Sequence, residues 1–259
     1  MNIVTKLEDW QIIRRQLLAK SIGLVHTMGN LHAGHISLLQ ASKQMNDVTV
    51  AAIFVNPTQF NQVRDFELYP RTLAHDITVL TENKVDYLLL LDEETLYPDH
   101  YHIQISENET ASMLEGVYRK GHFTGMLTIV LKFLNIVQPA RSYYGEKDYQ
   151  QWLLIKKMSQ ALFLAIEIIA CPTIRDDDGL ALSSRNSRLT PSQRKMAAHF
   201  PALLQSAENP AQITAKLQAL GFSVDYIEEK WQRRLGAVWI DDVRLIDNIP
   251  MEVHHVALS

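Results

Sequence analysis

Short apolar runs alternate with stretches of helical spacing over roughly the first 170 residues of the chain. Residues 48–55 form a largely apolar run rich in β-branched side chains, and residues 87–91 form another. Runs of this kind are typical of strands that are buried on both faces. The strands predicted in this way are residues 22–25, 48–55, 87–91, 142–144 and 164–170.

The segments between these runs carry apolar residues three or four positions apart, which is the spacing of one helix face. The first predicted helix covers residues 6–19, and Thr5 with Glu8 has the spacing of a capping box. Pro139 ends the longest predicted helix. Further helices are predicted from residue 34 onward and at three sets of apolar positions, 73, 77 and 80, then 127, 130, 134 and 137, then 155, 158 and 162.

This alternation predicts an α/β fold, namely a Rossmann-like, doubly wound parallel sheet with right-handed crossovers. After Arg188 the pattern changes, because Thr190 and Pro191 signal a helix start and short strand-like pieces follow. Those pieces are residues 223–227, 237–240 and 243–246. We therefore expect a second, smaller α+β domain at the C-terminus, with domains at residues 1–173 and 174–259.

Three polar segments each follow a predicted strand, at residues 27–35, 56–60 and 145–151. In a doubly wound sheet, ligands bind beyond the carboxyl ends of the strands, where the strand order reverses. Their common position predicts that the three segments form one site.

Composition narrows the function classes. The 259 residues are 47% hydrophobic and 21% charged with a net charge of -4, so a general nucleic-acid binder is disfavoured. The single cysteine, Cys171, excludes an intramolecular disulfide and fits a reducing compartment. We see neither a signal peptide nor a membrane-spanning run, and expect a cytoplasmic protein with no membrane partner.

His32 and His35 flank Gly34 between a predicted strand and a predicted helix. Unpaired N–H groups and the helix dipole favour anions at a helix N-terminus, and a three-residue offset lets both imidazoles face one pocket. Gly34 leaves room for a phosphate beside the backbone. The arrangement resembles the HxGH signature of the nucleotidyltransferase superfamily, which implies ATP bound at its α-phosphate and transfer of AMP.

Two other segments offer phosphate ligands. Lys147 supplies a point charge, and Asp148 could accept from ribose hydroxyls or cap the following helix. Arg185 offers a forked set of donors next to two serines.

Eight segments stand in the order found in the pantothenate synthetase family, and the sequence resembles that family over nearly its whole length. They read TMG, HAGH, IFVNPTQF, YPRT, HFTG, GEKDYQQ, DGLALSSRN and RLIDN, at residues 27–29, 32–35, 53–60, 69–72, 122–125, 145–151, 178–186 and 244–248.

The resemblance implies an ATP-dependent ligase that joins pantoate to β-alanine through a pantoyl-adenylate, releasing AMP and pyrophosphate, in pantothenate (vitamin B5) and coenzyme A biosynthesis. It implies that Mg2+ arrives on ATP, with Asp76 as an outer partner at most. It implies a homodimer formed by the large domain, and the run 49–55 is compatible with an edge pairing. Residues 1–173 would bind ATP and pantoate, and residues 174–259 would form a lid.

The resemblance also assigns roles to individual residues. His35, His32 and Lys147 would be catalytic, and Gln59 and Gln151 would bind pantoate, with Gln59 also near β-alanine. A flap over the pocket would include Glu115, Arg119 and His122. The implied ATP-binding residues are Met28, Gly29, Asn30, Leu31, His32, Ala33, Gly34, His35, Gly145, Glu146, Lys147, Asp148, Ile174, Leu182, Ser183, Ser184 and Arg185.

Two positions depart from the family pattern. His26 stands where the family usually has proline, and Leu182 replaces the usual methionine before the two serines. The change at residue 26 puts the turn before Met28 in question, whereas a backbone contact by Leu182 would be little affected.

Three alternatives stay open at this point. An adenylyltransferase that transfers AMP to a phosphate needs a second phosphate site, whereas Gln59 and Gln151 suit a hydroxyl and a single carboxylate. A tRNA-charging synthetase remnant is opposed by the lack of a basic tail. A non-catalytic nucleotide-binding module is opposed by the presence of both histidines with Lys147 and Arg185.

Overall fold

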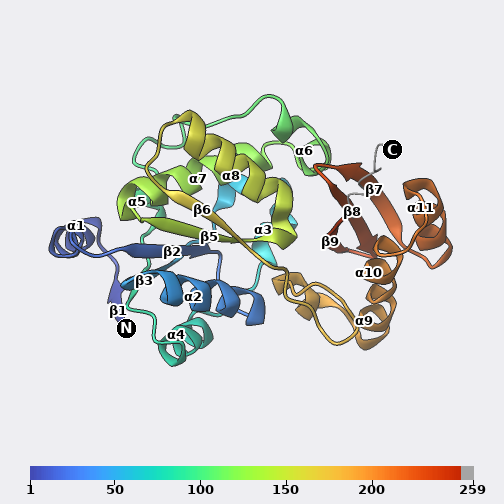
Figure 1. The fold of residues 1–259 in the computed structure, drawn as a ribbon, viewed down its shortest axis with the longest axis horizontal. Coiled ribbons are helices and arrows are strands. Elements are labelled where there is room, and N and C mark those ends of the chain that lie inside the picture. The colour runs from blue at the N-terminus through green and yellow to red at the C-terminus, as the bar shows by residue number, and fades with distance from the viewer. Residues whose placement is uncertain (252–259) are drawn as a thin grey trace, which may run out of the picture. The chain divides into compact units, whose positions relative to one another are not determined.

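The computed structural model describes residues 1–251, and the chain divides into two compact units, Met1–Pro172 and Thr173–Ser259 (Figure 1). The first unit contains a six-stranded sheet in the order β1-β4-β3-β2-β5-β6, and every pair of neighbours is parallel. The predicted doubly wound α/β fold is confirmed. The strands are β1 (Asn2–Val4), β2 (Ile22–Thr27), β3 (Val48–Ile53), β4 (Tyr87–Leu89), β5 (Arg141–Gly145) and β6 (Glu167–Cys171).

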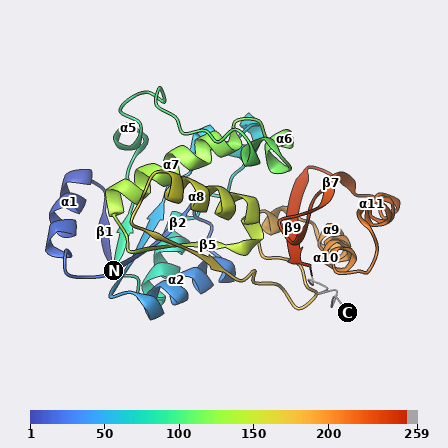
Figure 2. The same ribbon diagram turned by 45° about the horizontal axis from the view of Figure 1, so that its top comes forward.

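Helices cover both faces of this sheet, because successive strand residues point to opposite sides and both sides are apolar. The largest core packs α1, α7 and α8 on one face, and a second core packs α2 and α4 on the other (Figure 2). The helices of this unit are α1 (Leu7–Gln16), α2 (Ala33–Met45), α3 (Val63–Glu67), α4 (Leu73–Glu82), α5 (Glu93–Leu96), α6 (Glu115–Tyr118), α7 (His122–Val137) and α8 (Tyr149–Ala161), with 3-10 turns η1 (Pro57–Gln59), η2 (Thr110–Ser112) and η3 (Glu146–Asp148).

The strand order reverses between β2 and β5. From β2 the chain returns through α2 to β3 on one side, and from β5 it returns through α8 to β6 on the other. At a reversal of this kind the loops that leave the carboxyl ends of the two strands diverge, and ligands bind between them. The predicted phosphate-binding segments begin at these two strand ends.

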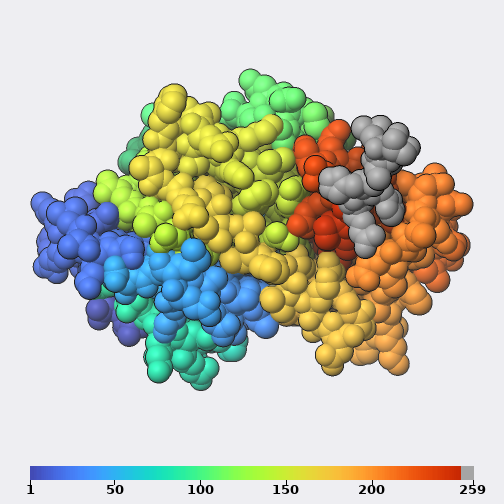
Figure 3. Space-filling model, in the orientation of Figure 1, coloured from blue at the N-terminus to red at the C-terminus, as the bar shows by residue number. Residues whose placement is uncertain are grey.

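Some local predictions were wrong. The predicted Thr5–Glu8 capping box does not form, since Lys6 is the N-cap residue of α1 and makes no side-chain cap bond. The strand β3, predicted as compatible with an edge, lies between β2 and β4 and has no open side for a second chain. The sheet edges are β1, which the sequence did not reveal, and β6, whose first residue, Glu167, is exposed and whose last, Cys171, is buried. In the space-filling view the golden atoms of this part of the chain show at the surface between the yellow and the blue segments (Figure 3).

The second unit is α+β, as predicted. A three-stranded antiparallel sheet, β7-β8-β9, packs its apolar face against short helices around Phe200. Two of those helices begin with capping boxes, at Thr190 and Asn209. The elements are η4 (Ser184–Arg188), α9 (Pro191–Ala197), α10 (His199–Leu204), α11 (Pro210–Ala219), β7 (Ser223–Lys230), β8 (Arg233–Ile240) and β9 (Val243–Pro250).

Among residues 1–251, no helix combines the length and apolar character that crossing a bilayer requires.

Candidate active site

The turn between β2 and α2 is held by a buried carboxylate from α4. Asp76 is 1% exposed, and its two oxygens accept the backbone N–H groups of Asn30 at 3.0 Å and Leu31 at 2.8 Å. The hydroxyl of Thr72 donates to the same carboxylate at 3.1 Å. Gly29 has φ +84°, and a Cβ there would lie 2.9 Å from an Asp76 oxygen, so the turn needs glycine at this position. Asp76 therefore holds the turn between β2 and α2 in shape. This role differs from the one implied by the resemblance, in which Asp76 is at most an outer partner of a metal ion.

The two histidines of the HAGH segment are fixed by the start of α2. His32 is the N-cap residue, and its Nδ1 accepts the backbone N–H of Gly34 at 3.1 Å. The Nδ1 of His35 accepts the backbone N–H of His32 at 3.4 Å, and its Nε2 lies 3.2 Å from the hydroxyl of Thr27. Because both Nδ1 atoms accept, the neutral rings carry their protons on Nε2. The ring centroids lie 4.2 Å apart, so the two imidazole rings lie side by side at the start of α2, as the three-residue offset predicted.

Both histidines are held in the neutral form. Burial lowers the pKa of His35 to about 3, assisted by the neighbouring His32 and Lys147. Burial also lowers the pKa of His32 to about 4, with Lys147 lowering it further and Asp148 opposing. In the absence of nucleotide the pair thus provides neutral N–H donors at pH 7. Phosphate oxygens near these rings would favour the protonated forms.

The electrostatic influence of Lys147 on both histidines shows that the loop after β5 reaches the start of α2. This is the approach that the reversal of strand order between β2 and β5 predicts. The Lys147 ammonium lies 4.0 Å from the carboxylate of Asp148 and is largely buried. Asp148 is the N-cap residue of α8 but makes no side-chain cap bond, so the capping role proposed from the sequence is wrong.

Gln59 is buried at the end of η1 and reaches the β2 turn. Its amide nitrogen lies 3.1 Å from the sulfur of Met28, and its amide oxygen accepts from Asn56 at 3.2 Å. Asn56 is itself fully buried, donates to the carbonyl of Gly125 and accepts from the hydroxyl of Tyr97. A thioether is a weak acceptor, so the Gln59 donor is free to exchange it for a ligand oxygen at little cost.

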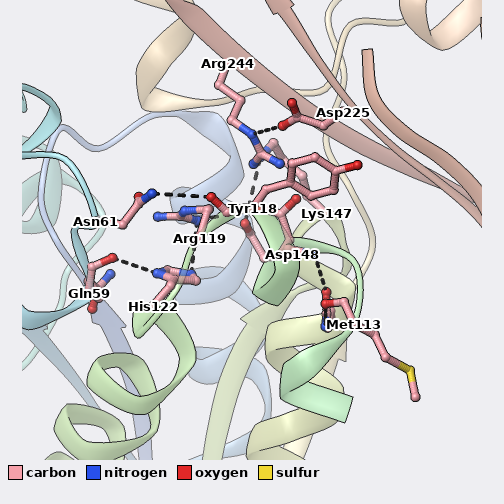
Figure 4. Close-up of polar contacts among 12 residues, drawn as sticks. Gln59, Asn61, Met113, Tyr118, Arg119, His122, Lys147, Asp148, Asp225 and Arg244 are labelled. Atoms are coloured by element: carbon pink, nitrogen blue, oxygen red, sulfur yellow. Dashed lines mark hydrogen bonds and ion pairs between the residues drawn. The ribbon is translucent and has the colours of Figure 1, made fainter. Parts of the chain in front are cut away.

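The backbone of Gln59 is held by a relay from α6 and α7. The Nδ1 of His122 donates to the Gln59 carbonyl at 2.8 Å, and the guanidinium of Arg119 donates to Nε2 of His122 at 3.0 Å (Figure 4). Arg119 also lies 3.6 Å from the carboxylate of the buried Glu115. The three residues predicted to lie in or beside a flap thus form a chain of contacts, from Glu115 to Arg119 to His122, that ends at the backbone of Gln59.

Gln151 lies in the first turn of α8 and is partly buried. Its neighbour Gln150 is buried and binds backbone groups of residues 110, 113 and 115, so it anchors the segment that leads to α6. Gln151 makes no side-chain hydrogen bond within residues 1–251, which leaves its amide for a ligand.

The other predicted ATP-binding residues belong to the second unit, where backbone pairing brings Ile174 and Leu182 together. The Leu182 N–H donates to the Ile174 carbonyl at 3.0 Å. The guanidinium of Arg175 makes a two-pronged ion pair with the buried Asp247, at 2.6 and 2.9 Å, which ties this hairpin to β9. Asp247 belongs to the RLIDN segment, so the ion pair gives this segment a structural role. Ser183 caps the turn η4 by accepting the N–H of Arg185.

Two structural roles escaped the sequence analysis, the bracing of the turn by Asp76 and the hydrogen bond from Asn56 to Gln59, although each left a signal. Asp76 falls on the same helix face as Leu73, Ile77 and Leu80, and a carboxylate on an apolar stripe usually has a specific partner. Asn56 directly follows a buried strand, where an amide side chain commonly organises a loop.

Comparison with known proteins places the whole chain in one family. The family model described as Pantoate-beta-alanine ligase matches residues 2–250. Curated pantothenate synthetases from Legionella pneumophila and Coxiella burnetii are 51% and 49% identical over 249 residues, covering 96% of this chain and 99% and 96% of those proteins.

A solved structure points the same way. The pantoate-beta-alanine ligase from Francisella tularensis, complexed with beta-gamma ATP and beta-alanine, is 43% identical with a TM-score of 0.93, covering 96% of this chain and 97% of that one. These similarities support the ligase prediction over the three alternatives.

The lowered histidine pKa values predict a pH-dependent stability. On unfolding, His26 (pKa lowered to about 4 by burial), His32 and His35 regain ordinary values near 6.5, so below pH 6.5 the unfolded chain binds protons that the folded chain does not. The free energy of unfolding should therefore fall with falling pH, by up to about 4 kcal/mol per pH unit for the three groups. Urea unfolding between pH 7 and 5 measures this slope. His35→Gln should flatten it, and a wild-type slope near zero would contradict the neutral assignment.

Asp76→Ala should lower the free energy of unfolding by about 2–4 kcal/mol, because two backbone N–H groups lose a charged acceptor inside the protein. Glu82→Ala removes an exposed carboxylate from the same helix and serves as the control, with a change within about 0.5 kcal/mol. Urea unfolding of the three proteins decides the matter. Equal stability of Asp76→Ala and Glu82→Ala would show that Asp76 does not hold the turn.

Proposed function

The chain belongs to the pantoate–β-alanine ligase family and catalyses ATP-dependent ligation of pantoate and β-alanine; we propose that it does so through a pantoyl-adenylate formed beside His32, His35 and Lys147. The observation that carries this proposal is the convergence of the HAGH segment with Lys147, next to the Met28–Gln59 contact. The segment after β2 thus offers hydrogen-bond donors to a phosphate, and the segment after β3 offers the Gln59 amide to an organic acid.

In the first step a carboxylate oxygen of pantoate attacks the α-phosphorus of ATP, and pyrophosphate leaves. The nucleotide lies against the turn Met28–His35 and against Gly145, Glu146, Lys147 and Asp148. The Nε2–H group of His32 donates to an oxygen of the α-phosphate, where charge grows in the transition state, and the Nε2–H group of His35 does the same when it exchanges the Thr27 hydroxyl for a phosphate oxygen. The Lys147 ammonium lowers the repulsion between the two approaching anions.

In the second step the neutral amine of β-alanine attacks the carbonyl carbon of the mixed anhydride. AMP leaves with the electrons of the acyl–oxygen bond, and the nitrogen loses a proton as the amide forms. The Gln59 and Gln151 amides hold pantoate in place for both steps. Holding the reactants in line provides effective molarities of about 10⁵ M or more, so no covalent enzyme intermediate is required.

Magnesium fits this site as an ion that arrives on the triphosphate. Within residues 1–251 no cluster of three or more His, Cys, Asp or Glu side chains could cage a metal, and both Asp76 oxygens already accept hydrogen bonds. Mg2+ commonly keeps several waters and binds through substrate phosphates. It would neutralise phosphate charge.

In the second unit we assign Ile174 to the adenine and Leu182, Ser183, Ser184 and Arg185 to the phosphates, as parts of a lid. The pairing of Ile174 with Leu182 supports this assignment, since it places the backbone of both segments together. We also propose a homodimer in the cytoplasm. With β3 inside the sheet, the support for the dimer is the family resemblance alone.

Product analysis tests the proposed function. With ATP, pantoate and β-alanine, the purified chain should release AMP and pyrophosphate and form pantothenate in equal amounts. A product that keeps the AMP group, or ADP with phosphate, would refute the adenylate route.

His35→Ala should leave the fold intact and reduce turnover by roughly 10²–10⁴, because one donor to the α-phosphate is lost. His35→Gln keeps an amide donor and should lose less. Steady-state kinetics with saturating substrates measures the effect, and circular dichroism checks the fold. Near-wild-type turnover of His35→Ala would remove the residue from the chemistry.

Gln59→Ala should raise the KM for pantoate by roughly tenfold or more, because a hydrogen bond to the acid is lost, and should leave the KM for ATP nearly unchanged. Gln62→Ala, at an exposed glutamine three residues away, is the matched control. If both variants share the wild-type pantoate profile, the acid does not bind at Gln59.

A further inference from the structure

The Nε2 atom of His26 is sealed from solvent and has no hydrogen-bond partner within residues 1–251. A buried polar atom without a partner costs about 1–3 kcal/mol, and native proteins keep few such atoms. The residue as a whole is only partly buried. A bound ligand would supply the hydrogen bond that this buried nitrogen lacks in the unliganded chain.

His26 lies on the α7 face of β2. Side chains alternate along the strand, so His26 follows Ile22 and Leu24 toward the core that contains α7, whereas Thr27 points to His35 and α2. Its ring packs on Phe133 of α7 with centroids 4.5 Å apart. The imidazole is thus separated from the phosphate-binding histidines by the strand itself.

The same face carries the proposed pantoate site. Met28 follows His26 by two residues, about 6.6 Å along an extended chain. Its sulfur contacts the amide of Gln59, and the Gln59 carbonyl is bound by His122 at the start of α7. His26 therefore lies two residues before the Met28–Gln59 contact along the chain, on the face of the sheet opposite to the one that Thr27 and His35 occupy.

The ring chemistry selects the kind of group that fits. Burial lowers the pKa of His26 to about 4, so the ring is neutral at pH 7. A neutral imidazole in apolar surroundings can donate to or accept from an alcohol, but it gives no charge to balance a carboxylate or a phosphate. Pantoate carries its reacting carboxylate at one end and a primary alcohol at the other. With the carboxylate directed at ATP, the alcohol is the end that extends toward His26.

We infer that His26 is a specificity-determining residue for the acid substrate, which hydrogen-bonds the terminal hydroxyl of pantoate. The inference rests on the proposed placement of pantoate beside Met28 and Gln59. The proline that the family resemblance leads one to expect at this position would fill space without any polar side-chain atom, so the contact depends on the histidine that stands there in this chain.

The test compares two acids in two proteins. His26→Phe keeps an aromatic ring against Phe133 and removes both nitrogens. The second acid is 2-hydroxy-3,3-dimethylbutanoate, which lacks only the terminal hydroxyl. Wild type should prefer pantoate, and His26→Phe should lose roughly 10- to 100-fold in kcat/KM for pantoate with little change for the analogue. The KM for ATP should stay the same in both proteins.

Two amide variants locate the nitrogen that binds. The side-chain nitrogen of Gln in His26→Gln lies near the position of Nε2, and that of Asn in His26→Asn lies near Nδ1. Restored preference for pantoate in His26→Gln supports Nε2 as the contact. Preference for pantoate retained in His26→Phe would overturn the inference, whatever the two amide variants do.

Gln59→Ala separates this inference from the proposed function. It should weaken both acids equally. If Gln59→Ala weakens both while His26→Phe discriminates as wild type does, His26 is only a core side chain and the pantoate site still holds. If Gln59→Ala changes neither acid, the placement of pantoate is wrong and the His26 inference is wrong with it.

Discussion

The site depends on the two hydrogen bonds that Asp76 accepts from the backbone of Asn30 and Leu31. They fix the turn between β2 and α2, and the turn fixes where α2 begins. His32 can cap that helix and His35 can stack beside it only if the helix begins there. Because the carboxylate comes from α4, a helix more than 40 residues further along the chain, the turn is tied to the sheet before any nucleotide binds.

The topology of the sheet places a positive charge, the Lys147 ammonium, near the two histidines. Reversal of strand order between β2 and β5 brings Lys147 within electrostatic range of both histidines, and its charge helps to keep them neutral. A neutral pair beside one ammonium can bind phosphate oxygens without a large cost of burying several like charges. The acid side of the site is built separately, from Gln59 and the relay of His122 and Arg119 behind it.

The sequence carried enough information for the architecture and for the convergence of the main segments. Strands buried on both faces appear as apolar runs, and the rule about strand ends needs only the order of the elements. β1 was missed because it has three residues, of which only Val4 is buried. The interior position of β3 was not readable, because an apolar run does not reveal which strands flank it.

Other features depend on contacts between distant segments and could not be predicted locally. The partners of Asp76 are such a case, and so is the sequestered nitrogen of His26. The neutral state of the two histidines is a third case, since the sequence shows imidazoles near an anion site but not the burial that lowers their pKa.

The central claim is that the braced turn, the neutral histidines and Lys147 form one centre that activates the acid before the amine arrives. Exchange of labelled pyrophosphate into ATP, measured without β-alanine, tests this claim most directly. We predict exchange that requires pantoate and proceeds in the absence of β-alanine. Exchange that appears only when β-alanine is added would contradict the account.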